Sequence, residues 1–322
     1  MWLRMNILVT GAGGFIGSHL CERLLANSKH QVYGVDTFIG PTPNNLKQHN
    51  LIYLKKHPRF TLIKDHLLNV DLRKLLNGID VVYHLAAIPG VRSSWGKDFN
   101  PYVENNIVVT QQLLEACKDI KLEKFIYAST SSIYGEKTGK VSEDMIPHPL
   151  SPYGATKLTG EHLCHLYQKS YGIPIVILRY FTVYGPRQRP DMAFHRFIKQ
   201  MTFDEPITVF GDGKQTRDFT YIDDCIDGTS AVLTANNVIG ETINIGGKER
   251  SSVLEIISLL EQITSKKAKI TFSPKVKGEP RHTWADISKA NHLLSYYPVT
   301  TLSEGLKKEY QYFQSIYEEG ST

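Results

Sequence analysis

A glycine-rich segment near the N-terminus limits the folds open to this 322-residue chain more than any other feature. Gly11, Gly14 and Gly17 follow the apolar run 6–9 at GxxGxxG spacing and precede an amphipathic segment. Glycines at this spacing permit a tight turn, a close approach of the backbone to a ligand, and close packing of the next helix on the strand. The segment therefore predicts a strand, a tight turn and a helix at the start of a parallel sheet.

Short apolar runs then alternate with amphipathic segments over the first 180 residues. The runs are rich in Val and Ile, as in strands that are buried on both faces of a parallel sheet. The six runs cover residues 6–9, 31–35, 60–63, 81–85, 125–128 and 175–178. An Asn-Pro pair at 100–101 and a Ser-Pro pair at 151–152 predict the starts of two helices, which run to about 118 and 170. The alternation predicts an α/β fold with a doubly wound parallel sheet of the Rossmann type.

The pattern changes after about residue 180, where Gly and Pro separate shorter elements. One clear helix remains over 252–263. We therefore expect residues 1–180 to form the sheet domain. Residues 181–322 are expected to form mainly a smaller C-terminal α/β lobe over the carboxyl edge of the sheet, and an exchange of chain back to the first domain stays open.

Composition and charge exclude several classes of protein. An apolar fraction of 41% with 21% charged residues is typical of a folded globular chain rather than a disordered one. A formal net charge of +5, without long runs of like charge, does not indicate a nucleic-acid or membrane surface. The chain has no long apolar stretch and no CxxC pair, which predicts a soluble cytoplasmic protein with unpaired thiols.

Asp36 supports a dinucleotide site at the glycine-rich turn. It ends the second apolar run, 19 residues after Gly17. A carboxylate about 20 residues past such a turn bonds the adenosine ribose, while the start of the helix holds the pyrophosphate. The carboxylate would repel a 2′-phosphate, and no Arg follows at Thr37 or Phe38, which favours NAD over NADP. The alternative is a structural turn followed by a surface Asp.

Tyr153 and Lys157 lie four residues apart, on one face of the predicted helix that begins at 152. A phenol has a pKa of about 10 and is a poor base at neutral pH, but a nearby ammonium lowers that pKa. Hydroxyls at 129–132, just after the fifth apolar run, would bond the reacting oxygen. The pattern indicates Tyr153 as a base, with Lys157 and Thr130 as its partners.

These motifs resemble the extended short-chain dehydrogenase/reductase family, and within it the nucleotide-sugar epimerases. The resemblance covers nearly the whole chain, and segment 179–193 is similar to UDP-glucuronate 4-epimerases in particular. Thr182 departs from the pattern, because many relatives have Asn there. His66, after Asp65, stands where the family usually has an apolar residue beside the adenine.

The resemblance implies roles for a wider set of residues. The implied NAD contacts are Gly11, Gly14, Phe15, Ile16, Gly17, Asp36, Asp65, Leu85, Ala86, Ala87, Asn106, Tyr153 and Lys157. The implied contacts with the UDP-sugar are Ser131, Ser132, Thr182, Arg189, Phe210, Arg217, Arg281 and Asp286. Of these, the two arginines at 217 and 281 would bind the diphosphate, and those at 131, 132, 182 and 189 a sugar carboxylate. The resemblance also implies a homodimer through helices 100–118 and 152–171. No metal site is expected, because His162 and His165 lack HExxH spacing.

The resemblance also implies a first chemical step. Tyr153 takes the proton of the sugar 4-hydroxyl while C4 gives a hydride to NAD. Relatives that eliminate water carry an Asp-Glu pair where this chain has Ser131 and Ser132, and decarboxylases usually have Glu at 132. We therefore expect a 4-epimerase that converts UDP-glucuronate to UDP-galacturonate by C4 oxidation, rotation of the keto-sugar and re-reduction. The alternatives are a 4-epimerase of neutral UDP-hexoses, a UDP-glucuronate decarboxylase, and a non-catalytic NAD-sensing protein.

Overall fold

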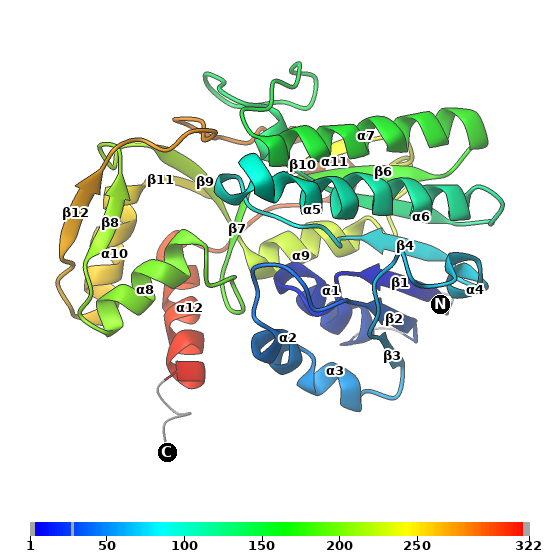
Figure 1. The fold of residues 1–322 in the computed structure, drawn as a ribbon, viewed down its shortest axis with the longest axis horizontal. Helices are drawn as coiled ribbons and strands as arrows, with labels where there is room; N and C mark the ends of the chain where they lie inside the picture. Colours follow the sequence, from blue (N-terminus) through cyan, green and yellow to red (C-terminus); the bar gives the residue numbers. More distant parts are fainter. Residues whose placement is uncertain (1–3, 27–28, 318–322) are drawn as a thin grey trace.

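The computed structural model describes residues 4–26 and 29–317, and it is organised around a seven-stranded parallel sheet (Figure 1). The strand order is β10-β6-β5-β4-β1-β2-β3. The strands are β1 (Asn6–Thr10), β2 (Gln31–Val35), β3 (Phe60–Ile63), β4 (Val81–His84), β5 (Lys124–Thr130), β6 (Ile175–Tyr180) and β10 (Thr242–Ile245). Strands β1 to β6 coincide with the six apolar runs, so the prediction of a doubly wound α/β sheet is confirmed.

Alternate residues of the central strands supply two hydrophobic cores, because successive side chains of a strand point to opposite faces. In β5, Ile126 packs in one core, whereas Phe125 and Tyr127 pack in the other. The helices that cover the two faces are α1 (Phe15–Ala26), α9 (Ile222–Ala231) and α11 (Ser288–Leu294) on one side, and α4 (Leu72–Leu76), α6 (Val109–Cys117) and α7 (Pro152–Tyr171) on the other. Two short helices, α2 (Asn44–Asn50) and α3 (Ile52–Lys56), follow β2.

The helix predicted over 100–118 is present but consists of three parts. They are α5 (Asn100–Tyr102), a π-helical turn over 103–108, and α6. Asn100 does not cap this helix as expected: its φ and ψ of −54° and −45° are helical, because a 3₁₀ turn over 96–99 leads directly into it. Single π turns are frequent at functional sites, and this one contains Asn106.

Helix α7 begins where its sequence predicts. The side-chain oxygen of Ser151 accepts the N–H of Gly154 at 3.1 Å, and Pro152 occupies the first helical position. The helix ends at Gly172, whose φ of 72° is left-handed. It lies beside α6 on the same face of the sheet (Figure 1).

The chain leaves the sheet after β6 and builds a smaller lobe, which lies on the left in Figure 1. A three-stranded sheet of order β11-β9-β7 and a two-stranded sheet of β12 and β8 form this lobe together with three helices. Its elements are β7 (Thr182–Tyr184), α8 (Ala193–Thr202), β8 (Ile207–Phe210), β9 (Thr216–Tyr221), β11 (Glu249–Ser252), α10 (Val253–Thr264), β12 (Ile270–Ser273) and α12 (Leu302–Tyr317). The predicted helix at 252–263 is α10, and Ser252 and Glu255 form a capping box at its start.

The second half of the chain also returns to the sheet. Strand β10 pairs with β6, and α9 and α11 cover one face of the large sheet. Residue 180 is thus the point where the chain first leaves the sheet, and the two parts share one core. The four cysteines are buried and unpaired. Among residues 4–26 and 29–317, no helix combines the length and the apolar character needed to cross a membrane.

Candidate active site

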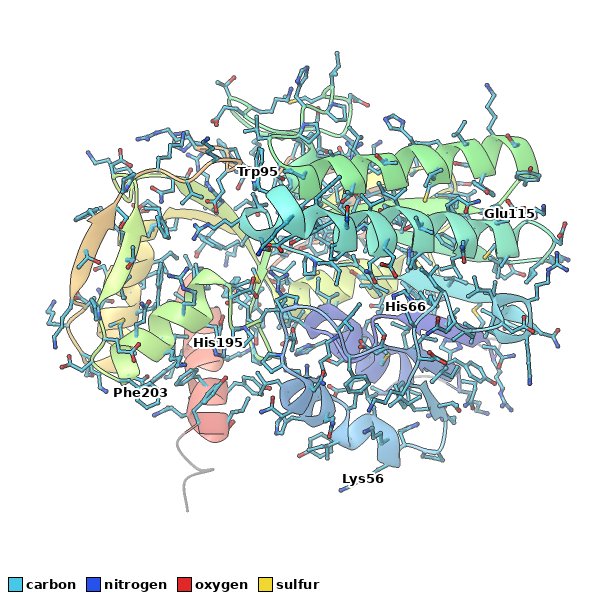
Figure 2. All side chains as sticks on the ribbon, viewed as in Figure 1. Lys56, His66, Trp95, Glu115, His195 and Phe203 are labelled. Carbon is cyan, nitrogen blue, oxygen red and sulfur yellow. The ribbon has the colours of Figure 1, made fainter. Side chains whose placement is uncertain are left out.

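A cavity of about 680 Å³ lies at the carboxyl ends of β1, β2, β4 and β5 and extends to α8, β8 and β9 of the smaller lobe. Doubly wound sheets bind ligands at this edge. Figure 2 labels a histidine from each part of the molecule. His66, after β3, lines the cavity, whereas His195, on α8, packs on Phe313 of α12.

The glycine-rich turn forms one wall of this cavity. Gly11 has a φ of 74°, and its N–H donates to the carbonyl of Val35 at 2.8 Å. A Cβ at position 17 would lie 2.1 Å from the carbonyl oxygen of Gly11, so only glycine allows α1 to start this close to the turn. This cradle and the N-terminus of the 12-residue α1 fit a pyrophosphate. The predicted cofactor residues that line this wall are Gly11, Gly14, Phe15, Ile16 and Gly17.

Asp36 lies at the end of β2 in a dense set of hydrogen bonds. Its carboxylate accepts the N–H groups of Gly13 and Phe38 at 2.9 and 2.7 Å. Lys47, from α2, donates to the same carboxylate at 2.9 Å, and both side chains are more than nine-tenths buried. Because a carboxylate offers about four acceptor positions, Asp36 retains one for a ribose hydroxyl. The sequence analysis did not find Lys47, since a lone Lys on a short helix resembles a solvated residue.

The next strand ends complete the predicted cofactor side. The residues there that line the cavity are Asp65, Leu85, Ala86 and Ala87. Asn106 lies behind this wall instead: it is buried, and its side chain bonds both the N–H and the carbonyl of Ile88 and the hydroxyl of Thr156. Asn106 therefore holds the cavity wall in place without being part of its surface.

Tyr153, Thr130 and Lys157 line the same cavity, so the structure brings the predicted catalytic trio together. Burial raises the pKa of the Tyr153 phenol, while the nearby guanidinium of Arg189 and a hydrogen bond with Thr130 act in the opposite direction. Tyr102 contacts the Tyr153 ring edge-on, with 6.3 Å between ring centroids. The phenol is thus enclosed, and a positive side chain lies near it.

Lys157 is placed differently from the expectation. Its ammonium lies 4.1 Å from the centroid of the Tyr127 ring, and burial lowers its pKa to about 7. For the Tyr153 phenol, Arg189 is the cation that opposes the effect of burial on the pKa. Lys157 lies one helical turn after Tyr153 on α7, and the contact with the Tyr127 ring offsets only part of the cost of burying its charge.

A buried ion pair fixes α7 to the sheet beneath this trio. The Nε and Nη2 of Arg179, on β6, donate to the two carboxylate oxygens of Glu161, on α7, at 3.0 and 2.8 Å. The hydroxyl of Ser129, on β5, donates to the same carboxylate. Ser129 directly precedes Thr130, and Glu161 lies one turn after Lys157. The ion pair therefore sets the distance between the strand end and the helix that carry the trio.

Most of the predicted substrate residues line the far half of the cavity: Ser131, Ser132, Thr182, Arg189, Phe210 and Arg217. Arg189 makes a bidentate pair with Asp191, with Nε and Nη2 at 3.0 and 2.9 Å from its oxygens. This pair neutralises part of the charge that a ligand carboxylate would meet. Ser131 and Ser132 follow β5 directly, so they lie beside Thr130 at the strand end.

Two further cavity residues were missed by the sequence analysis. The carboxylate of Glu279 accepts from Arg217 at 3.1 Å and from Arg92 at 2.6 Å, and the Arg92 guanidinium lies 4.5 Å from the centroid of the Phe210 ring. Glu279 and Arg92 are far apart in the sequence, and each alone resembles a surface charge. Glu279 thus holds Arg92 and Arg217 side by side and neutralises part of their charge, and a diphosphate would bind the guanidinium N–H groups that Glu279 leaves open.

Arg281 and Asp286 do not line the main cavity. Arg281 borders a small adjoining hollow, which it shares with Phe210 and Arg217, and its guanidinium pairs with Asp212 at 2.8 Å. Asp286 accepts from the N–H and hydroxyl of Ser288. Arg281 therefore lies at the rim of the main cavity, and the Asp286 carboxylate bonds the turn that follows it in the chain.

The comparisons with known proteins agree with this geometry. Residues 7–246 match the model of the NAD dependent epimerase/dehydratase family. The chain belongs to this family. A Bacillus subtilis (strain 168) protein, Uncharacterized UDP-glucose epimerase YtcB, is 62% identical over 98% of this chain and 99% of its own length.

Two other relatives are named for one reaction. The UDP-glucuronate 4-epimerase of Thermodesulfobacterium geofontis is 44% identical over 94% of both chains. The crystal structure of the UDP-glucuronic acid 4-epimerase of Bacillus cereus, in complex with UDP-glucuronic acid and NAD, is 68% identical. It has a TM-score of 0.97 and covers 97% of this chain, which in turn covers all of that one.

Few side chains of this cavity could take up or release a proton during a reaction of the epimerase/dehydratase family. The Tyr153 phenol lines the cavity, and the hydroxyls of Ser131 and Ser132 cannot serve as an acid and a base near neutral pH. His84 is fully buried between the hydroxyls of Thr10 and Thr110, and burial lowers its pKa to about 3. Within the part of the chain that the structure describes, no group of three His, Cys, Asp or Glu side chains could hold a metal ion.

Proposed function

We propose that this protein is an NAD-dependent 4-epimerase of UDP-sugars, and that UDP-glucuronate and UDP-galacturonate are its substrate pair. One observation carries the proposal. A single cavity joins the glycine-rich cradle, the Tyr153 phenol, and a set of hydroxyls with Arg189 that suits a sugar carboxylate. The names of the Bacillus cereus and Thermodesulfobacterium relatives, and the ligands bound in the Bacillus cereus structure, support the same assignment.

The cofactor is held by the half of the cavity nearest the sheet. The cradle at Gly11 to Gly17 receives the pyrophosphate, and Asp36 bonds the adenosine ribose. Asp65, Leu85 and the two alanines that follow it form the remaining wall. When bound, NAD supplies the acceptor for the C4 hydride and the donor that returns it. Lys157, behind Tyr153, donates to the nicotinamide ribose.

Tyr153 takes the proton of the sugar 4-hydroxyl at its Oη and returns it to the product. Deprotonation is helped by the guanidinium of Arg189 and by the hydrogen bond with Thr130, both of which oppose the effect of burial on the pKa of the phenol. Thr130 also holds the reacting oxygen. Epimerisation requires no second acid or base, only room for the keto-sugar to rotate.

A uronate substrate adds a requirement, because its 4-ketone is a β-keto acid. Loss of CO2 is fast when the bond from C5 to the carboxylate aligns with the carbonyl π system. Ser131, Ser132, Thr182 and Arg189 hold the carboxylate out of that alignment. Asp191 takes the Nε and Nη2 donors of Arg189, so a substrate carboxylate would meet the remaining N–H groups of a guanidinium whose charge is already partly neutralised, and the hydroxyls share in its orientation.

The nucleotide lies in the smaller lobe. Arg217 binds the diphosphate, with Arg281 at the rim, and Phe210 flanks the uracil. We assign residues 1–180 mainly to NAD and the catalytic side chains, and residues 181–322 mainly to the nucleotide-sugar. Asp286, which bonds Ser288, takes part only through the turn that it stabilises.

We further propose that the protein is a cytoplasmic homodimer through α5, α6 and α7. Leu166 and Tyr171, on α7, are apolar side chains with 60% and 54% of their surfaces exposed, which is the surface such an interface would cover. Leu113 and Leu114 belong to the core beneath α6 and contribute nothing to that interface. Sedimentation analysis of the wild type and of Leu166→Glu tests the dimer: the variant should sediment as a monomer, and an unchanged dimer would contradict this arrangement.

Incubation with separate UDP-sugars tests the function. UDP-glucuronate should yield UDP-galacturonate with no net change in NAD, and UDP-glucose should react far more slowly. Faster reaction of UDP-glucose would assign the protein to neutral UDP-hexoses, and UDP-pentose as main product would assign a decarboxylase. Arg189→Ala should raise the share of CO2 released; an unchanged share would remove Arg189 from the carboxylate site.

A further inference from the structure

The segment 185–191, between β7 and α8, carries Arg189 into the cavity and is anchored at three other positions. The side chain of Gln188 donates to the carbonyl of Val183 at 3.3 Å and accepts the N–H of His195 at 3.2 Å. The N–H of Gly185 donates to the buried carboxyl group of Glu309, on α12, at 2.9 Å. Arg187 points to the opposite side, where its Nη1 donates to the hydroxyl of Ser18 at 3.2 Å and its Nη2 to Glu22 at 2.8 Å. Arg189 thus follows three anchored positions, of which only Arg187 reaches α1.

Arg187 makes these contacts from an unfavourable backbone conformation. Its φ is 69°, in the left-handed region that side chains other than glycine rarely adopt. Such a conformation persists only where surrounding contacts hold it, and it is concentrated at functional sites. Only 14% of the Arg187 side chain is exposed, so the contacts with α1 are largely removed from water. The Arg187 side chain does not line the cavity.

The helix at the other end of this contact is the one that begins at the glycine-rich cradle. Ser18 lies in its first turn and Glu22 one turn later. The pair of Arg187 and Glu22 therefore joins the helix that binds the cofactor to the segment that carries Arg189. No other side chain of segment 185–191 makes a hydrogen bond to α1 among the bonds that the described residues form.

We propose that Arg187 is a positioning residue: by joining segment 185–191 to α1, it fixes Arg189 relative to Tyr153 and so determines whether the keto-sugar is re-reduced or decarboxylated. The proposal rests on the proposed function. Decarboxylation breaks the bond between C5 and C6, and its electron pair moves into the C4 carbonyl to give an enolate. CO2 leaves, a proton from water adds at C5, and the 4-keto-pentose becomes UDP-pentose when the hydride taken from C4 is returned to that carbon by the bound cofactor. This step competes with reduction whenever the carboxylate is free to rotate.

Charge-neutral variants at the two ends of the contact test the proposal. Arg187→Gln and Glu22→Gln each remove the ion pair. Gln has the size and shape of Glu, and at position 187 it is shorter than Arg but remains polar. Both variants should raise the ratio of UDP-pentose to UDP-galacturonate by roughly tenfold, a part of the 10²-fold effect that a displacement of about 1 Å can have. The KM for UDP-glucuronate should rise more than kcat falls, and the content of bound NAD should remain unchanged.

A neighbouring residue of α1 provides the matched control. Arg23 is next to Glu22 but pairs with Asp227, on α9, away from the segment. Arg23→Gln should therefore leave the product ratio unchanged. Arg187→Lys retains the charge and should restore most of the wild-type ratio. Arg187→Gly removes the side chain and also the backbone strain, so it should fold well and still release more CO2.

The outcomes separate this proposal from the one on which it rests. A wild type that does not epimerise UDP-glucuronate would overturn the proposed function before any variant is made. A wild type that epimerises it, with wild-type product ratios in Arg187→Gln, Glu22→Gln and Arg187→Gly, would overturn the positioning role alone. A change of equal size in Arg23→Gln would also overturn it, because the effect would then belong to α1 in general.

Discussion

Replacing Arg179 with methionine removes the cation of the buried ion pair beneath the catalytic trio. Methionine retains much of the volume of the side chain, so the change tests charge and hydrogen bonding rather than packing. Glu161 then keeps only the hydroxyl of Ser129 as a donor among the bonds described for it. The substitution also removes the hydrogen bonds that Arg179 donates to the Tyr134 hydroxyl and to the carbonyl of Glu143.

The expected cost follows from the burial of the two side chains, of which 7% and 2% are exposed. Breaking a buried pair by removing one partner costs about 3–5 kcal/mol, because the remaining charge is left uncompensated. We expect Arg179→Met to lower the free energy of unfolding by about 4 kcal/mol. In the double variant with Glu161→Gln no charge stays buried, so the two losses should be less than additive by about 2 kcal/mol.

Urea-induced unfolding of the four proteins in this cycle measures both quantities, with Trp fluorescence as the signal. Lys269→Met serves as the control, because its ion pair with Asp204 lies on the surface and should have no measurable effect. A loss of less than about 1 kcal/mol in Arg179→Met, or strictly additive losses in the double variant, would refute this reasoning. Turnover should fall in Arg179→Met, since Ser129 and α7 lose their common anchor.

Three other substitutions test separate parts of the site. Tyr153→Phe should lower turnover by about 10²–10⁴-fold and leave the NAD content unchanged, because it removes only the base; near-normal turnover would exclude Tyr153 from that role. Gly17→Ala places a Cβ 2.1 Å from the carbonyl oxygen of Gly11 and should distort the cradle. The purified variant should therefore contain little NAD, as measured by the absorbance of the cofactor released on denaturation. A full content of NAD would contradict the need for glycine at this position. Burial raises the pKa of Asp218 to about 6, above its value in the unfolded chain, so its contribution to stability is complete below pH ~4 and is lost as the pH rises through 6. Urea unfolding from pH 4 to 7 should show this fall, of roughly 3 kcal/mol, in the wild type but not in Asp218→Asn; parallel curves would refute it.

The parts of the fold that could be predicted are those that local sequence determines. Strands buried on both faces need unbroken apolar runs, and β1 to β6 were recognisable for that reason. The pair of Tyr153 and Lys157 was predictable because both lie on one helix, whose start is marked in the sequence by Ser151 and Pro152. Strand β10 was not predicted, since its pairing with β6 depends on a return of the chain from residue 242.

The missed residues share one physical property: each acts through a partner that is distant in sequence. Lys47 bonds Asp36, Glu279 joins Arg92 to Arg217, and Arg187 reaches α1. A single charged residue has the same local pattern whether it is solvated or buried against a partner. The π turn at 103–108 was missed for a related reason, because its residues are ordinary helix formers and the extra residue is accommodated by tertiary bonds of Asn106.

The most direct test of the central claim is NMR of the reaction of UDP-glucuronate in D2O. If Tyr153 deprotonates the 4-hydroxyl and the hydrogen on C4 leaves and returns as a hydride, UDP-galacturonate should form with protium at both C4 and C5. Deuterium at C5 in the product would show that a carbanion or enol forms there, and deuterium at C4 would show exchange with solvent. Either result would contradict epimerisation by oxidation and re-reduction at C4.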